Sequence, residues 1–150
     1  MREIDFRLKD RISNKWYYGY PMSSVINNTV AFKGDKRLGS DYFDLLADAT
    51  TLGQYIGLND KNNIKIYDGD IVKILYTDWA SKSDNDTRTL EEYLDSLTKV
   101  GVVCWDNLSL CYHLKMKNDC FSSIHCGKYG YIEVIGNIHD NPELLEGDDE

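Results

Sequence analysis

The chain has 150 residues, of which 42% are hydrophobic and 12% aromatic, so it can bury the core of one domain, or of one domain with an appendage. Its formal net charge of −8 offers no counterion-release free energy at phosphates, which disfavours general nucleic-acid binding. The sequence has no long apolar run and no secretory leader, which excludes a membrane-spanning helix, and its four cysteines therefore predict free thiols in a reducing cytoplasm.

Negative charge is concentrated in the second part of the chain. Residues 1–53 carry eight Lys or Arg against seven Asp or Glu, whereas residues 54–150 carry nine against eighteen. Four of these acidic residues lie in the tail 146–150, for which a solvated, disordered end is the simpler interpretation. The alternative is an acidic surface that competes for a basic partner.

The first third of the chain is predicted to be rich in β-strands. Ile4, Phe6 and Leu8 alternate with charged side chains, a pattern typical of a half-buried strand. Further strands are expected at 16–20, ended by Pro21, and at 25–26 and 30–32 around a hairpin at 27–28. A loop is expected at 33–40, and either a helical turn or a strand at 41–46.

Residues 54–76 predict strands separated by two tight turns. Turn-forming residues run from Asp60 to Asn63, and asparagine tolerates a left-handed backbone. The second turn is Asp68-Gly69-Asp70, where the glycine can adopt a positive φ. The residues between and after these turns are isoleucine-rich and partly alternating, as expected of strands.

One helix is predicted, within an insertion at 77–99. An exposed loop at 79–88 precedes Thr89, which forms a capping box with Glu92. An apolar stripe then follows at helical spacing, and we expect the helix to end near Lys99, before Gly101. The stripe comprises Leu90, Tyr93, Leu94 and Leu97.

The remaining sequence again predicts strands and turns. A strand at 100–105 is followed by a turn at 106–109, an alternating segment at 110–116 and a turn at 118–119. Residues 129–138 predict a strand pair or one long strand that bends at Gly136. Pro142 then sits at the first position of a short helical turn.

Three blocks of this sequence resemble the YopX family of small proteins encoded by phages and prophages. They are the opening M-R-E-I-D-F-R, the central Q-Y-I-G-L-N-D-K-N continuing through I-Y-D-G-D-I-V, and the terminal E-V-I-G-N-I-H-D-N-P-E-L-L. The blocks cover about a quarter of the chain, in family order. Asn63 stands where the family usually has glycine, and residues 16–53 match no family pattern.

The resemblance implies a mainly β protein with a small SH3-like β-barrel, or roll, an N-terminal β extension and one inserted α-helix. Closely spaced short strands with turn signals between them also favour a closed or rolled sheet. We expect a β-rich region at 1–53 that packs on the barrel, the barrel itself at 54–145, and the acidic tail at 146–150. The resemblance implies no activity and supplies no catalytic residue.

Cysteine and histidine residues in the second half suggest a zinc site, but their spacing argues against one. Structural zinc sites usually present paired ligands two to four residues apart, whereas these cysteines are separated by six, eight and five residues. We therefore expect free thiols, and no bound metal or cofactor. The residues weighed are Cys104, Cys111, Cys120, Cys126, His113, His125 and His139.

Catalytic signatures are equally weak. Asp68 and Asp70 flank a glycine as a tight turn requires, and neither they nor Asp78 shows the cleft that hydrolytic carboxylates need. Cys120 and Cys126 adjoin His125 only in sequence, whereas catalytic nucleophiles meet their bases in space. Because no phosphate-binding loop, dinucleotide fingerprint or nucleophile elbow is present, we expect a protein that is not an enzyme.

Aromatic residues are the most suggestive functional feature. Core packing is the simpler interpretation of most of them, including the cluster at 16–20. Tyr76, Trp79 and Trp105 are nevertheless candidates for partner binding, because grooves between the loops of SH3-like barrels bind peptides or bases. The remaining motif residues are expected to hold turns: Asp60, Asn63, Asp68, Gly69, Asp70, Gly136 and Pro142.

The preferred hypothesis is a non-catalytic module that binds a phage or host protein in the host bacterial cytoplasm. A nucleic-acid-binding barrel is the first alternative, although the net charge argues against it, and an enzyme of unknown type is the second. Self-association through an unpaired strand or the helical stripe is a further alternative. The insertion at 77–99 is the favoured working surface, because loops on a rigid scaffold commonly carry function.

Overall fold

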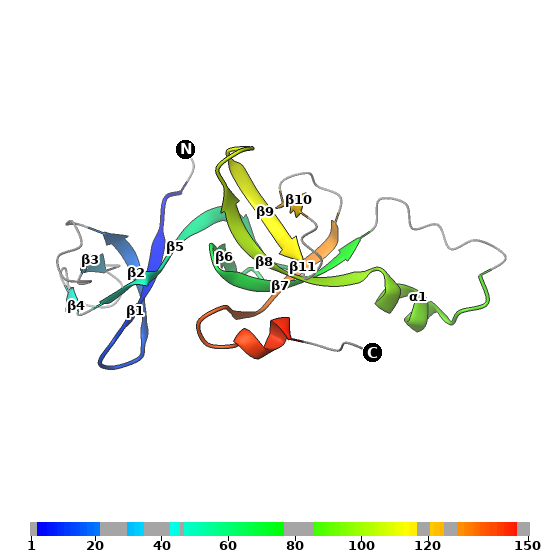
Figure 1. The fold of residues 1–150 in the computed structure, drawn as a ribbon, viewed down its shortest axis with the longest axis horizontal. Coiled ribbons are helices and arrows are strands. Elements are labelled where there is room, and N and C mark those ends of the chain that lie inside the picture. Colours follow the sequence, from blue (N-terminus) through cyan, green and yellow to red (C-terminus); the bar gives the residue numbers. More distant parts are fainter. Residues whose placement is uncertain are drawn as a thin grey trace. The chain divides into compact units, whose positions relative to one another are not determined.

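The structure is a computed structural model that describes residues 3–21, 30–34, 43–45, 47–76, 86–116, 121–124 and 129–146. The chain divides into two compact units, Met1–Leu58 and Asn59–Glu150. The described residues are mainly β, with two antiparallel sheets and one α-helix (Figure 1). This confirms the mainly β class and the single helix for the described part of the chain.

The first sheet begins with an N-terminal hairpin. Leu8 is fully buried, and Phe6, Tyr17 and Ala49 pack against it. Asn14 adopts a φ of 57° in the turn of this hairpin. The strand order is β4-β3-β2-β1-β5-β6, with bounds β1 (Phe6–Asp10), β2 (Trp16–Pro21), β3 (Val30–Gly34), β4 (Phe43–Leu45), β5 (Ala47–Asn59) and β6 (Lys65–Tyr67).

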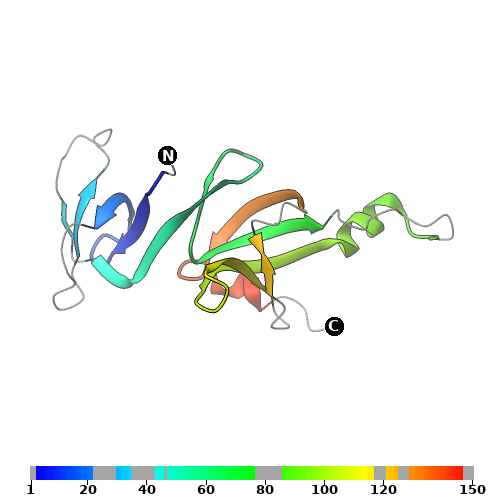
Figure 2. The same cartoon turned by 90° about the horizontal axis from the view of Figure 1, so that it is seen from above.

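The second sheet has the strand order β10-β9-β8-β7-β11. Its strands are β7 (Asp70–Tyr76), β8 (Thr98–Asp106), β9 (Cys111–Met116), β10 (Phe121–Ser123) and β11 (Tyr129–Asn137). Figure 2 shows β7 between β8 and β11, and these two strands pair with it on its two edges. The central position explains the burial of β7, in which Ile71, Val72 and Ile74 are fully inaccessible to solvent.

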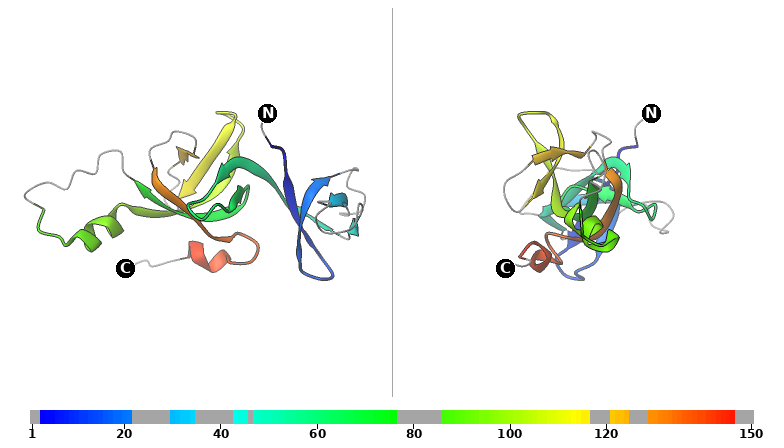
Figure 3. Two further views of the ribbon diagram at one scale, coloured as in Figure 1. Left: turned by 180° about the vertical axis from the view of Figure 1, so that it is seen from behind. Right: turned by 90° about the vertical axis from the view of Figure 1, so that its right-hand side faces the viewer.

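The described strands do not close into a barrel. β10 and β11 stand at opposite ends of the second strand order, and the described residues contain no pairing between them. Figure 3 shows the strands from two further directions. The expectation of a closed sheet is therefore wrong for the described part of the chain, because the short strand β10 pairs with β9 alone.

The predicted helix is present, and its capping box is confirmed. Helix α1 (Leu90–Ser96) has Thr89 as its N-cap, and Glu92 returns a hydrogen bond to the Thr89 N–H group. The helix ends earlier than predicted, with Leu97 as its C-cap, and Gly101 lies inside β8. In the described part of the chain, no helix has the length and apolar character needed to cross a membrane.

Several other boundaries differ from the sequence-based expectation. β1 begins at Phe6, leaving Ile4 exposed, and β3 extends through Lys33 and Gly34, where a loop was expected. Residues 43–45 of the ambiguous segment at 41–46 form the strand β4, and β10 was not predicted. The last predicted strand is one strand, β11, whose register shifts between Val134 and Gly136. The hairpin at 27–28 and the turn at 118–119 lie outside the described residues.

Candidate functional site

The first predicted turn is organised by the Asp60 carboxylate, which is 7% exposed. Its Oδ1 atom accepts hydrogen bonds from the N–H groups of Asn62 at 2.8 Å and Ile64 at 2.9 Å. Its Oδ2 atom accepts one from Val134 in β11 at 3.2 Å, across 74 residues of sequence. Asn63 has a φ of 65°, a left-handed conformation that asparagine adopts more readily than most residues.

The charge state of Asp60 follows from these contacts. Burial pushes the pKa of the carboxyl upward, but the hydrogen bonds from Ile64, Val134 and Asn62 outweigh it and lower the pKa below its usual value. Beside it, the Lys61 N–H group donates to the Ile132 carbonyl at 2.9 Å, and the Lys61 ammonium lies 2.7 Å from Glu133. The first turn is thus held to β11 by backbone and side-chain contacts.

Hydrogen bonds also hold the second predicted turn in place. Asp70 is 1% exposed, and its Oδ2 atom accepts a hydrogen bond from the Tyr67 N–H group at 2.7 Å. Gly69 has a φ of 83°, and it donates to Val103 at 2.9 Å and accepts from Ile138 at 3.0 Å. Asp68 lies in the same turn, between β6 and β7.

In the terminal block, Asn141 and Leu144 approach the backbone at residue 136 so closely that only glycine fits there. A Cβ atom added there would lie 2.7 Å from Asn141 Oδ1 and 2.9 Å from Leu144 Cδ1. Both contacts belong to the short 3-10 segment that begins at Pro142, η3 (Pro142–Leu145), and its N-cap. The absence of a side chain at Gly136 lets η3 pack against β11.

The aromatic candidates lie far apart in the second unit. Tyr76, at the end of β7, forms an edge-to-face pair with Tyr129, with ring centroids 5.3 Å apart. Trp105 is 43% exposed and pairs edge-to-face with Tyr112 at 5.1 Å. Because Leu75 pairs with Thr98 at the start of β8, whereas Trp105 is near its end, the structure does not bring Tyr76 and Trp105 together. Trp79 lies outside the described residues.

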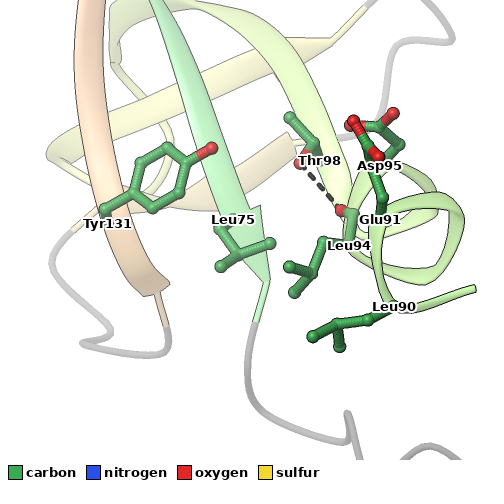
Figure 4. A pocket seen from close by; sticks show the side chains of 7 residues that line it. All are labelled: Leu75, Leu90, Glu91, Leu94, Asp95, Thr98 and Tyr131. Atoms are coloured by element: carbon green, nitrogen blue, oxygen red, sulfur yellow. Dashed lines mark hydrogen bonds between the residues drawn. The ribbon is translucent and has the colours of Figure 1, made fainter.

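A groove lies instead between α1 and the sheet of the second unit. Figure 4 shows Leu90 and Leu94 of α1 on one side, and Leu75 of β7 and Tyr131 of β11 on the other. The volume is about 450 Å³, and the lining is mostly apolar. Such a volume falls in the range of small-ligand and side-chain pockets. The complete lining is Leu75, Leu90, Glu91, Leu94, Asp95, Thr98 and Tyr131.

The helix leaves two leucines of its apolar stripe exposed beside this groove, whereas Tyr93 and Leu97 are half-buried. No residue of α1 is buried, and Leu90 and Leu94 are 67% and 40% exposed. An amphipathic helix normally covers such a stripe by packing, so these leucines are available to another surface. The helix is held locally: Thr98 Oγ1 donates to the Leu94 carbonyl at 2.9 Å, as Figure 4 shows.

Charge at the groove is negative. The seven residues of α1 include Glu91, Glu92 and Asp95, and no basic residue occupies the last turn. Arg88, just before the helix, is engaged by Asp86, with 2.6 Å between Nη2 and Oδ2. Sequence analysis identified the helix but missed Leu75 and Tyr131, because neither strand carries a signal that it faces a groove.

Two of the four cysteines are described, and both are free thiols. Cys111 lies 3.1 Å from the Nε2 atom of His113, while Cys104 is opposite His113 on the neighbouring strand. His139 lies after β11, where its N–H group donates to Asn137. No metal-binding group of three His, Cys, Asp or Glu residues occurs in the ranges that the structure describes. Asp78, Cys120, His125 and Cys126 lie outside them.

Comparison with known proteins tests the resemblance directly. The profile described as YopX protein matches residues 5–146, which is most of the chain. The chain belongs to the YopX family. Among solved structures, this YopX chain is similar to the crystal structure of protein EF1440 from Enterococcus faecalis, with a TM-score of 0.54 and 21% sequence identity. The alignment covers 97% of this chain and 99% of that chain, and at this identity it supports the fold alone. No curated protein matches the sequence.

The central and terminal YopX blocks meet in space. The Asp60 turn contacts Ile132, Glu133 and Val134, and Gly69 contacts Ile138. The described polar groups of these blocks are largely engaged in holding strands and turns together. The apolar groove, in contrast, is lined by residues outside the two blocks of this YopX chain.

Proposed function

We propose that this protein is a non-catalytic interaction module, and that the groove beside α1 receives a segment of a protein partner. The observation that carries this proposal is the amphipathic helix with no buried residue, whose leucines flank an apolar groove. Helix-in-groove and groove–peptide contacts use this combination of an apolar floor and a polar rim. The groove supplies the anchor of an interface that extends beyond it.

The charge of the rim selects the chemistry of the partner. Glu91 and Asp95 line the groove, and the whole chain carries a net charge of −8. A segment with apolar anchors flanked by Lys or Arg would gain attraction at this rim, whereas an acidic segment would be repelled. A second copy of this chain would bring the same carboxylates to the interface. The proposed occupant is therefore a basic, amphipathic segment of a phage or host protein.

The engagement of Asp60 and Asp70 in backbone hydrogen bonds supports a non-catalytic function. Asp60 accepts from three N–H groups and Asp70 accepts from that of Tyr67, as carboxylates that hold turns do. We further propose an SH3-like roll for 54–145, origin in a phage or prophage, and action in the host cytoplasm. The acidic composition argues against the nucleic-acid alternative.

The test uses two synthetic peptides that share one pair of leucines at i and i+4 and differ only in flanking charge, lysine or glutamate. Binding is measured by fluorescence anisotropy, and amide chemical shifts of Leu75 and Leu94 locate the peptide. We expect the lysine peptide alone to bind. The variant Leu94→Asp should weaken it by at least about tenfold, because an apolar contact is replaced by a charge.

The matched control is Leu108→Asp, which changes an almost fully exposed leucine in the β8–β9 turn and should leave binding unchanged. The proposal fails if neither peptide binds, if both bind equally, or if Leu94→Asp binds as well as the unchanged protein. A dimer that light scattering detects and Leu94→Asp dissolves would also overturn it, because a second copy would then fill the groove.

A further inference from the structure

Four polar side chains gather where β8 turns into β9. Cys104 faces His113 and Asp106 faces Cys111 as cross-strand partners in the antiparallel register. Since alternate residues share a face of a strand, these four positions lie on one face of the hairpin. Ser109, in the intervening turn, adds a hydroxyl group to the same cluster.

The distances form a continuous chain from carboxylate to thiol. Ser109 Oγ donates to Asp106 Oδ2 at 2.5 Å, which leaves an oxygen lone pair facing His113 Nε2 at 2.7 Å. Cys111 Sγ lies 3.1 Å from the same Nε2 atom. Asp106 Oδ2 is 3.9 Å from Nε2, close enough to stabilise a protonated imidazole.

We propose that Cys111 is a reactive thiol that His113 activates for exchange with small-molecule disulfides. The Cys111 thiol gives its proton to solvent, and the thiolate, stabilised by a hydrogen bond from the Nε2–H group of His113, attacks one sulfur of the disulfide. A mixed disulfide forms on Cys111 as the S–S bond of the reagent breaks. The departing thiolate takes a proton from solvent, so Cys111 is oxidised and half of the reagent is reduced.

The surroundings keep Asp106 ionised for this task. The hydrogen bond from the Ser109 side chain lowers the pKa of its carboxyl most, followed by the N–H groups of Leu108 and Ser109. Cys104 provides the contrast within the same hairpin. Burial raises the pKa of the Cys104 thiol, and the nearby carboxylate of Asp68 raises it further. The two described cysteines should therefore differ in reactivity, because the thiolate is the attacking species.

This site is separate from the groove. Asp106 ends β8, whereas Thr98, which lines the groove, begins it. The reaction of Cys111 is therefore independent of peptide binding in the groove, and either proposal can fail alone.

The test follows the reaction of the native, reduced protein with 4,4′-dithiodipyridine, a neutral disulfide whose released thiopyridone is measured by absorbance. We expect a fast phase that disappears in Cys111→Ser and remains in Cys104→Ser, Cys120→Ser and Cys126→Ser. This phase should exceed the rate of Cys104 by at least about tenfold. His113→Gln should slow it to the rate of an ordinary thiol, and mass spectrometry of the labelled peptide assigns the site.

Asp106→Asn serves as a second variant should His113→Gln fail to fold. It removes the charge that stabilises the imidazolium while conserving shape, and it should also slow the fast phase. The proposal is overturned if Cys111 reacts no faster than Cys104. It is also overturned if neither a folded His113→Gln protein nor Asp106→Asn changes the rate.

Discussion

Asp60 offers the sharpest test of how the YopX motifs stabilise this fold. Replacement by asparagine keeps one side-chain oxygen for the N–H groups of Asn62 and Ile64. The other oxygen becomes an NH₂ group, which would face the N–H group of Val134 with no acceptor between them. The substitution therefore removes the long-range bond to β11, and the negative charge, with almost no change in shape.

The expected loss follows from the number and kind of bonds. A hydrogen bond to a charged acceptor contributes about 1.5 to 3 kcal/mol, and a buried N–H group left unsatisfied adds a cost of similar size. We therefore expect Asp60→Asn to lower the free energy of unfolding by about 2 to 3 kcal/mol. Asp60→Ala, which removes all three acceptor contacts, should cost about 3 to 4 kcal/mol.

The pH dependence identifies the charge as the cause. The pKa of Asp60 in the folded protein lies below its usual value of 3.8, so its ionised form stabilises the fold at higher pH. This contribution is fully present above the unfolded pKa and is lost as the pH falls through the folded pKa. The stability difference between the unchanged protein and Asp60→Asn should thus shrink between about pH 6 and about pH 2.5.

Urea denaturation followed by circular dichroism at both pH values measures this difference. Amide hydrogen exchange of Val134 reports the lost bond directly. Asp95→Asn, which changes an exposed carboxylate of α1, is the control and should have little effect. A loss below about 0.5 kcal/mol near pH 6, or a difference that is independent of pH, would refute this account of the turn.

Two further predictions concern packing and capping. Gly136→Ala should lower the free energy of unfolding by about 1 to 3 kcal/mol, because its Cβ would overlap the N-cap and side chain of η3. Thermal unfolding checks this, with the exposed Gly130→Ala of the same strand as control, and an equal melting temperature for both would contradict it. Thr89→Ala should destabilise α1 by about 1 kcal/mol, so hydrogen exchange of the α1 amides should become faster. The free energy of global unfolding should stay unchanged, because no residue of the helix is buried. A parallel drop in global stability would show that α1 is tied to the core.

The sequence allowed the class of fold and the positions of most turns in 54–145 to be predicted. The helix start was readable because a capping box is local chemistry between Thr89 and Glu92. The helix end could not be read from the sequence. Gly101 suggested an end near Lys99, but Thr98 pairs with Leu75 in the sheet, and this pairing ends the helix earlier. Local signals therefore failed where tertiary contacts decided the structure.

The groove and the cysteine cluster were less accessible to sequence reasoning. The alternating segment at 110–116 places Cys111 and His113 on one strand face, but the position of Asp106 opposite Cys111 depends on the register of the hairpin. Likewise, Tyr131 lines the groove only because β11 pairs with β7 across more than fifty residues. Such long-range register cannot be derived from one sequence, since many pairings satisfy the same alternation.

The position of β7 has a consequence for synthesis of the protein on the ribosome. This strand is isoleucine-rich and buried, yet one of its two partners, β11, emerges only near the end of translation. Until then one edge of β7 presents unpaired backbone groups, which can recruit strands from other nascent chains. Prematurely terminated products that stop before Tyr129 should accordingly be the aggregating species in cells that express this gene.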